Sequence, residues 1–413
     1  MVYRSEFVPF VWLGDEDRGL LWFAESDKGW EVEGDKPPIE IERLGGSVSL
    51  KVHFILAKSP VPIARPRTYS FGFQASPVKP LPERWRRFRL APGPGANIHI
   101  LWTSPKMMRH FGYPEARDPR EFSRYVKRMH AQGLKVVPYS LLLALSEASV
   151  EFKYFGRWWM VMPPRCDRGS SDVLAFKEGG ICGVCPACED YADFIVYKTK
   201  KFVEELGLDG LYHDWSHVIP CRNELHGCGY VKGGERRPTW PVLATRDLYR
   251  RIYAMLKSQP RETFMMAHMS GRIWLPMLSF TDAWLDGEQF RPLLWPHPER
   301  DYTDVLTLDQ FRAEFMGRQW GTMPFFLPEL APEARKRVKP TRQLLSLTLV
   351  HDVPVWAIWC NQKVVFEARR VLDEFGYVDA EFLPYWANEL SLIHISEPTR
   401  PRLSSYAVFC LKK

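Results

Sequence analysis

The sequence predicts an α/β fold: a (β/α)8 TIM-type barrel preceded by a partial antiparallel β-sandwich and followed by a truncated C-terminal β-domain. Three observations predict it. The first sixty or so residues carry short runs in which polar and apolar residues alternate. From about residue 68, apolar strand-like runs alternate with helical segments, as in βα units. Two of these runs end in carboxylates ahead of polar loops, the position where a parallel barrel holds its chemistry.

Residues 1–65 are the predicted sandwich domain. The runs 7–13 and 20–24 are apolar and are separated by a polar, glycine-bounded turn, whereas 47–55 alternates between polar and apolar residues. Three prolines then mark a linker to the next domain: Pro60, Pro62 and Pro66.

The catalytic barrel is predicted over residues 66–378. Its eight strands are expected at 68–73, 97–103, 135–140, 209–214, 263–268, 279–285, 322–327 and 353–359. Helices are expected between them at 119–132, 189–206, 241–258, 308–318, 333–349 and 364–375. Asp118 before Pro119 is typical of a helix start, and either Thr307 or Asp309 could cap the fourth of these helices.

The C-terminal end of the chain contains two further segments. Residues 379–389 are predicted to begin another β-domain that is cut short. Residues 390–413 resemble the translation of a sequencing adapter, in two blocks at 390–400 and 405–413 separated by a short variable stretch. We therefore expect 390–413 to be an artefact of an assembled metagenomic read that adds nothing to the fold.

Composition narrows the class of protein. The chain has 413 residues, 25% of them charged, and a net charge of +7, without a basic stripe or a nucleic-acid-binding motif. No apolar run is long enough to insert into a membrane, and Met1 is not followed by a signal-peptide pattern. Aromatic residues make up 14%, which suits either a large core or a sugar-binding cleft. The compartment, cytoplasmic or exported, and the oligomeric state stay open.

Two carboxylates are the predicted catalytic residues. Asp214 ends the fourth predicted strand, and Glu288 follows the sixth. Cleavage of a glycosidic bond needs one carboxyl group to protonate the leaving oxygen and a second to act as nucleophile, base or stabiliser of positive charge. We assign the second role to Asp214 and the acid/base role to Glu288. The structural alternative is that Asp214 caps a loop and Glu288 makes an ion pair.

Other side chains at or near predicted strand ends are candidate substrate-binding residues. Asp282 and Asp286 share one face of the sixth strand and are the main rivals of the catalytic pair. His268 ends the fifth strand and could bond a sugar hydroxyl or be a structural histidine. Trp215 and Trp359 could stack on a sugar or pack in the core. The remaining candidates are Gln74, Lys79, Trp102, Tyr139, Glu329 and Asn361.

The cysteines fall into two groups. The first offers four thiols in one long loop, a set that could bind structural zinc, form disulfides or remain free: Cys166, Cys182, Cys185 and Cys188. Cys221 and Cys228 bracket Asn223 and His226 just after Asp214. They could form a disulfide, or bind metal together with His226. No cofactor is expected to be required for catalysis.

Three segments resemble proteins related to glycoside hydrolase family 123: residues 71–80, 221–230 and 286–288. The likeness covers most of residues 7–389 and implies a β-sandwich, a catalytic barrel and a C-terminal β-domain. Characterised members of that family are β-N-acetylgalactosaminidases, which use an adjacent Asp-Glu pair and the substrate's own acetamido group as nucleophile. In this chain Asp214 is followed by Trp215, and no Asp-Glu pair stands at a predicted barrel strand end.

The function expected from these observations is hydrolysis of a glycosidic bond by a carboxylate pair at the barrel mouth, on a carbohydrate of the N-acetylhexosamine type. The alternative from another class is a carbohydrate-binding or scaffold protein with a non-catalytic barrel. A carboxylate pair within about 5 to 10 Å in one cavity would favour the enzyme.

Overall fold

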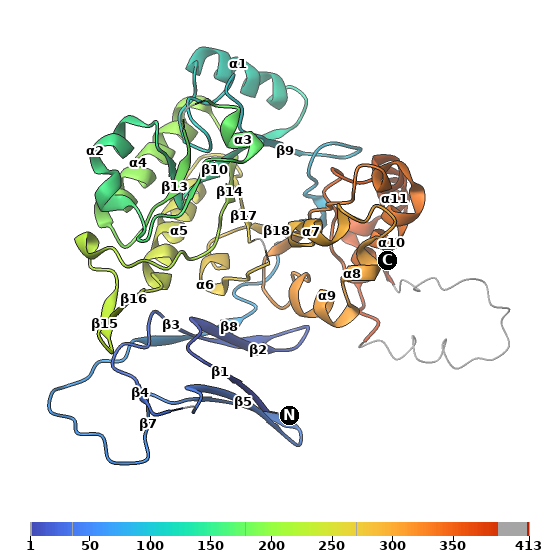
Figure 1. Cartoon of the computed structure of the whole chain (residues 1–413). Helices are drawn as coiled ribbons and strands as arrows, with labels where there is room; N and C mark the ends of the chain where they lie inside the picture. Colours follow the sequence, from blue (N-terminus) through green and yellow to red (C-terminus); the bar gives the residue numbers. More distant parts are fainter. Residues whose placement is uncertain (1, 35, 178, 270, 387–410, 413) are drawn as a thin grey trace, which may run out of the picture.

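The computed structural model describes residues 2–34, 36–177, 179–269, 271–386 and 411–412. Two antiparallel sheets formed by the N-terminal residues lie below a curved parallel sheet that is flanked by helices (Figure 1). The predicted adapter-derived segment, 390–413, lies outside the described residues except for two of its members. Within the described ranges, no helix combines the length and the apolar character that a membrane crossing requires.

The N-terminal strands form the sheets β1-β5-β6 and β2-β3-β8 and the parallel pair β4-β7. Their bounds are Val2–Ser5 (β1), Phe10–Gly14 (β2), Gly19–Ala24 (β3), Glu31–Val32 (β4), Ile39–Leu44 (β5), Ser47–Val52 (β6), Ile55–Leu56 (β7) and Phe71–Ser76 (β8). The strand predicted at 68–73 as the first of the barrel is therefore wrong. β8 pairs antiparallel with β3, because its alternating pattern suits the edge of an antiparallel sheet. The predicted domain limits otherwise stay predictions.

Strand β3 is buried on both faces. Trp22 and Ala24 pack with Trp30 and Ile39 in the core of the sandwich. Leu21 and Phe23, which alternate with them, belong to the core of the barrel. The sheet β2-β3-β8 is thus the layer that joins the two parts of the molecule.

The parallel sheet has the order β9-β10-β14-β17-β18-β19. Its strands are Ile98–Leu101 (β9), Lys135–Leu141 (β10), Gly210–Asp214 (β14), Phe264–His268 (β17), Ala283–Asp286 (β18) and Met323–Phe326 (β19). Six of the eight predicted barrel strands are confirmed. The two outer positions are held by single parallel bridges, Leu90 to Ile98 and Phe326 to Val355.

The two outer positions meet through side chains. The indole Nε1 of Trp356 donates to the carbonyl of Ala91 at 2.7 Å, and the guanidinium of Arg369 bridges the two positions by donating to the carbonyls of Pro92 and Val355, at 3.1 and 2.9 Å. The eight chain segments therefore encircle one core, as in a (β/α)8 barrel, and the predicted fold class is confirmed.

Helices surround this sheet (Figure 1). They are Pro119–His130 (α1), Val150–Trp159 (α2), Ser171–Leu174 (α3), Glu189–Leu206 (α4), Val242–Lys257 (α5), Leu275–Leu278 (α6), Arg291–Leu294 (α7), Tyr302–Val305 (α8), Leu308–Glu314 (α9), Val338–Leu349 (α10) and Gln362–Phe375 (α11). Asp118 caps α1 through the amides of Arg120 and Glu121, as predicted. Of the two candidate caps for α9, Thr307 is the one whose side chain accepts the amide of Gln310.

A long excursion between β10 and α4 and another between β14 and α5 extend beyond the barrel. The first contains α2, α3 and the sheet β11-β13-β12, with bounds Ala144–Ser146 (β11), Cys166–Asp167 (β12) and Ile181–Gly183 (β13). The second carries the hairpin Tyr230–Lys232 (β15) and Glu235–Arg237 (β16). Short 3-10 helices lie at Trp85–Arg87, Glu224–His226, Glu288–Phe290, Ala334–Lys336 and Tyr377–Asp379, and a final pair joins Glu381–Phe382 (β20) to Leu411–Lys412 (β21).

Candidate active site

A cavity of about 500 Å³ opens at the carboxyl ends of the parallel strands. Seven of the eight chain segments that form the barrel contribute to its lining, and the segment at Leu90 does not. The excursion after β10 contributes as well. The lining residues are Ile100, Trp102, Phe111, Tyr139, Asp167, Ser170, Asp172, Ile181, Tyr212, Asp214, Trp215, His268, Glu288, Arg291, Leu327, Glu329, Trp356, Ile358 and Trp359. This is the end of a parallel barrel at which catalytic residues are found.

Asp214 and Glu288, the predicted catalytic pair, both line this cavity. His268 lies between them: its Nδ1 is 3.2 Å from Asp214 Oδ1, and its Nε2 is 3.3 Å from Glu288 Oε2. The path from Asp214 Oδ1 through the ring of His268 to Glu288 Oε2 is roughly 9 Å long, so these two oxygens are at most that far apart. This upper limit is compatible with the carboxylate spacing of retaining glycosidases, about 5 Å, and with most of the range of inverting ones, about 6.5 to 9.5 Å.

Asp214 is held in its ionised form. Its Oδ2 accepts the hydroxyl of Tyr139 at 2.8 Å, and its Oδ1 accepts the amide of Trp215 at 2.7 Å. Burial alone would raise the pKa of Asp214, but the charge of His268 and these hydrogen bonds hold it below its ordinary value.

His268 carries the matching positive charge. Burial would lower its pKa, but Asp214 and then Glu288 raise the pKa of His268 to about 9. The hydroxyl of Tyr212 lies 2.8 Å from Nδ1. Near neutral pH, the centre of the cavity is therefore an imidazolium flanked by two acidic side chains.

The backbone between β18 and the following 3-10 helix directs Glu288 into the cavity. Gly287 has φ of 133°, and a side chain there would collide with the carbonyl of Leu327. Its amide donates to Asp286 Oδ1 at 2.8 Å. A residue other than glycine could not make this close turn.

Asp286 is fully buried and does not line the cavity. It accepts the amides of Gly271 and Gly287, each at 2.8 Å, and burial raises its pKa to about 6. It supports the turn that carries Glu288, so the prediction that it contacts substrate is wrong.

Glu329 is a third carboxyl group in the cavity. It is 4% exposed, and its Oε2 has no hydrogen-bond partner among the described residues. Burial raises the pKa of Glu329 to about 7, with Arg291 opposing and Glu288 reinforcing the shift. A carboxyl with such a pKa is a proton donor at neutral pH.

Aromatic rings make up much of the cavity wall. Trp102, Tyr139, Trp215 and Trp359 were predicted there and line it, and the ring centroids of Trp102 and Tyr139 are 4.6 Å apart. Trp215 and Trp359 also have positive φ, 53° and 56°. For bulky side chains that backbone conformation is strained, and such strain is concentrated at functional sites.

Three predicted residues lie at the opposite, amino end of β18. Gln74 bonds the hydroxyl of Ser279, and the ammonium of Lys79 bonds the carbonyl of Thr281. Asp282 pairs with Lys257 at 2.8 Å and also accepts the amide of Met265. These side chains join the barrel to its surroundings, so their predicted substrate contacts are wrong.

Asn361 also lies away from the cavity. Its amide nitrogen donates to the carbonyls of Lys336 and Arg337, each at 3.4 Å, which fixes the loop before α11. The prediction for Asn361 failed because a position a few residues past a strand end does not specify the direction of the side chain.

Sequence reasoning missed several polar lining residues. Asp167 and Asp172 come from the excursion after β10, and Arg291 begins α7. The guanidinium of Arg291 lies 3.8 Å from the ring centroid of Trp295. The only available signal for Arg291 was its position three residues after Glu288. Nothing in the sequence indicates that the excursion folds back over the cavity.

The cysteines group differently from the predicted zinc set. Cys166 and Cys182 form a disulfide between β12 and β13, which excludes a site built from all four thiols. Cys185 and Cys188 are free, and so are Cys221 and Cys228. Of the two alternatives for Cys221 and Cys228, a disulfide or metal binding with His226, the disulfide is not formed.

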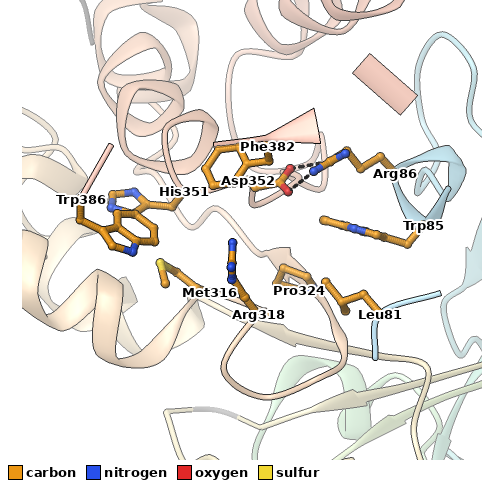
Figure 2. Close-up of a pocket in the computed structure, with 11 residues that line it drawn as sticks. Leu81, Trp85, Arg86, Met316, Arg318, Pro324, His351, Asp352, Phe382 and Trp386 are labelled. Atoms are coloured by element: carbon orange, nitrogen blue, oxygen red, sulfur yellow. Dashed lines mark hydrogen bonds and ion pairs between the residues drawn. The ribbon is translucent and has the colours of Figure 1, made fainter. Parts of the chain in front are cut away.

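A second pocket, of about 230 Å³, lies at the amino ends of the strands. Figure 2 shows Arg86 paired with Asp352 on one side of it, and Trp386 beside His351 on the other. The Arg86–Asp352 ion pair spans 2.5 Å, so this carboxylate is already neutralised. Asp214, Glu288 and Glu329 lie in the cavity at the other end.

The fold and the cavity define a (β/α)8 barrel with an acidic, aromatic-lined mouth. No family model matches the sequence, and neither does any curated protein, so the resemblance to family 123 is not confirmed. Similar solved structures include a noncanonic maltogenic α-amylase from Thermotoga neapolitana, at 14% identity over 70% of this chain and 71% of that one, with a TM-score of 0.43.

Two further solved structures cover more of this chain. An α-galactosidase from Thermus thermophilus matches at 13% identity over 89% of this chain and 75% of its own, with a TM-score of 0.42. A cycloalternan-degrading enzyme from Trueperella pyogenes matches at 10% identity over 89% and 60%, with a TM-score of 0.46. Likenesses at this level carry no inference about the reaction.

Proposed function

We propose that this protein is a glycoside hydrolase that cleaves its substrate in the cavity at the carboxyl ends of the barrel strands. The observation that carries the proposal is the placement of Asp214 and Glu288 in one cavity, on either side of His268. Their separation, at most roughly 9 Å, is compatible with the carboxylate pairs of glycosidases.

The residues take distinct roles. Asp214, held ionised, stabilises the positive charge that develops on the sugar ring, or attacks its anomeric carbon. Glu288 is the acid/base: its side chain is 40% exposed and is thus accessible to the leaving-group oxygen. His268 is a positioning residue, because its two ring nitrogens contact one carboxylate each.

Aromatic rings supply the sugar-binding surface. Trp102 and Trp359 are 43% and 40% exposed although both line the cavity, so their faces are available for stacking on a sugar. For the kind of sugar, we propose an N-acetylhexosamine, which the sequence resemblance alone supports. Because this chain lacks the adjacent Asp-Glu pair, the proposed mechanism does not include assistance by the acetamido group of the substrate.

Mutation of the pair is the direct test. Wild-type protein is screened on aryl glycosides, including the N-acetylgalactosaminide, and the best substrate is then used for Asp214→Asn and Glu288→Gln. We expect each variant to lose about 10²- to 10⁴-fold in kcat. Glu299→Gln, a change at a side chain that is 68% exposed, is the matched control. Near-native hydrolysis by both cavity variants would refute the assignment.

The alternative is a carbohydrate-binding protein without hydrolytic activity. One observation favours it. The imidazolium of His268 contacts both carboxylates, and an ion network with a purely structural role would make the same contacts. Calorimetry separates the two functions. Sugar binding without turnover on any substrate of the screen supports the binding protein, whereas turnover that depends on Asp214 supports the hydrolase.

A further inference from the structure

Three thiols and one imidazole converge outside the candidate active site. One ligand atom from each of four residues lies within 4.8 Å of all the others: Cys185, Cys221, His226 and Cys228. The three cysteines are at most 3% exposed, and none of them is in a disulfide. Cys185 comes from the loop between β13 and α4, and the other three come from the excursion after β14.

The distances between these ligand atoms fit a tetrahedral metal centre. The sulfurs of Cys185 and Cys228 are 3.7 Å apart, and Cys221 Sγ is 3.3 Å from His226 Nε2. With zinc–sulfur bonds of about 2.3 Å and zinc–nitrogen bonds of about 2.0 Å, a tetrahedron has sulfur–sulfur edges of about 3.8 Å and sulfur–nitrogen edges of about 3.5 Å. A disulfide would need sulfurs only about 2.05 Å apart.

Neighbouring groups orient the cluster as they do around bound metals. His226 Nδ1 lies 2.6 Å from the carbonyl of Trp158, so that nitrogen carries the proton and Nε2 presents its lone pair to the sulfurs. The amide of Asn223 donates to Cys221 Sγ at 3.3 Å. A histidine fixed through its second nitrogen is characteristic of metal ligands.

Asn223 fixes the geometry from the other side. Its side-chain amide donates to the carbonyls of Arg157 and Met160, at 3.0 and 2.8 Å, at the end of α2. The cluster thereby ties together α2, the segment before α4 and the loop after β14. These segments continue into the excursion and the loop that line the cavity.

We propose that Cys185, Cys221, His226 and Cys228 bind one zinc ion as a closed Cys3His structural site. Three thiolates and an imidazole are ligands that zinc favours, and a full set of four protein ligands leaves no position for substrate. The other group of possible metal ligands among the described residues, Glu147 with Cys166 and Cys182, has both of its sulfurs in a disulfide. The site is independent of the proposed hydrolysis.

The first measurement is the metal content of the full chain purified without chelator. We expect one zinc per chain, and a fall in the melting temperature when a strong chelator removes it. Cys221→Ser and His226→Ala should lose the metal. His226→Cys should keep it, because a thiolate replaces the imidazole, and Cys188→Ser should keep it because Cys188 is outside the cluster.

A second measurement covers variants that fail to fold. Wild-type protein refolded with cobalt should show the visible absorption of tetrahedral cobalt–thiolate coordination, and zinc should displace it. Folded protein without stoichiometric zinc even after refolding with the ion would overturn the proposal. A different metal at full occupancy, or zinc retained in both Cys221→Ser and His226→Ala, would overturn it as well.

Discussion

His268 is the residue on which the electrostatics of the cavity depend. Its pKa is raised from about 6.5 to about 9 in the folded protein. The stabilisation from this charge is therefore complete below about pH 6.5, declines as the pH rises, and is lost above about pH 9. At roughly 1.4 kcal/mol per pKa unit it amounts to no more than about 4 kcal/mol.

The first prediction compares wild type with His268→Gln in urea unfolding at pH 6 and pH 9.5. The wild-type free energy of unfolding should fall more steeply with pH than that of the variant, because glutamine carries no titrating charge. Lys79, whose pKa burial lowers to about 8, titrates in both proteins, so the difference between them is the quantity to compare. Equal pH dependence would contradict a charged His268.

The second prediction concerns Glu288 and Glu329. The alkaline limb of kcat/KM reports the proton donor of the free enzyme. With Glu288 as the acid/base, Glu288→Gln loses about 10²- to 10⁴-fold in kcat, whereas Glu329→Gln keeps the alkaline limb and loses less than about 10-fold in kcat. The opposite result, loss of a limb near pH 7 in Glu329→Gln, would assign the donor role to Glu329, whose pKa is about 7.

Among single residues, the sequence predicted the two carboxylates of the cavity, Asp214 and Glu288, but not all of the residues that line it with them. Asp214 and Glu288 could be predicted because both follow apolar runs at the carboxyl side. Asp282 also lies beside an apolar run, yet it comes before β18 rather than after it and pairs with Lys257. A two-residue alternation assigns the face of a strand but not which of its ends bears the site.

The excursion after β10 is the element that shapes the cavity wall. The Cys166–Cys182 disulfide closes a loop with a sequence separation of 16, and Asp167 and Asp172, between the two cysteines, line the cavity. For a loop of this length the constraint is worth about 3 kcal/mol in the chain-entropy account.

The third prediction is that Cys166→Ser combined with Cys182→Ser loosens this segment. Amide hydrogen exchange over residues 166–182 should become faster, and KM should rise more than kcat falls, because the wall rather than the carboxylates is disturbed. Cys188→Ser is the control. Unchanged exchange in the double variant would show that the disulfide is dispensable for the order of the excursion.

Elements with local signals were the ones that could be predicted. The strands β10, β14 and β17 stand out as apolar runs, and α1 is marked by its Asp-Pro start. β8 could not be assigned to the sandwich, since pairing with β3 across about fifty residues leaves no local trace. The same limit applies to Cys185, which meets Cys228 across 43 residues.

The sheet β2-β3-β8 packs against both the rest of the N-terminal sandwich and the barrel, and so joins the two parts of the molecule. Phe10 packs on Trp274 with ring centroids 4.7 Å apart, and Trp12 packs on Trp320 at 4.6 Å. Leu21 is 1% exposed within the core of the barrel. The sheet β2-β3-β8 therefore contributes to the apolar core of the barrel as well as to that of the sandwich, and we expect the two parts to unfold together.

The last prediction tests this coupling with neighbouring leucines of β3. Leu21→Ala should lower the free energy of unfolding by about 2 to 5 kcal/mol, because it leaves a cavity in the shared core. Leu20→Ala, at a position 50% exposed, should change it by less than about 0.5 kcal/mol. Both proteins should unfold in a single transition by fluorescence and circular dichroism. Two transitions, with Leu21→Ala shifting only the smaller one, would show that the sandwich unfolds independently of the barrel.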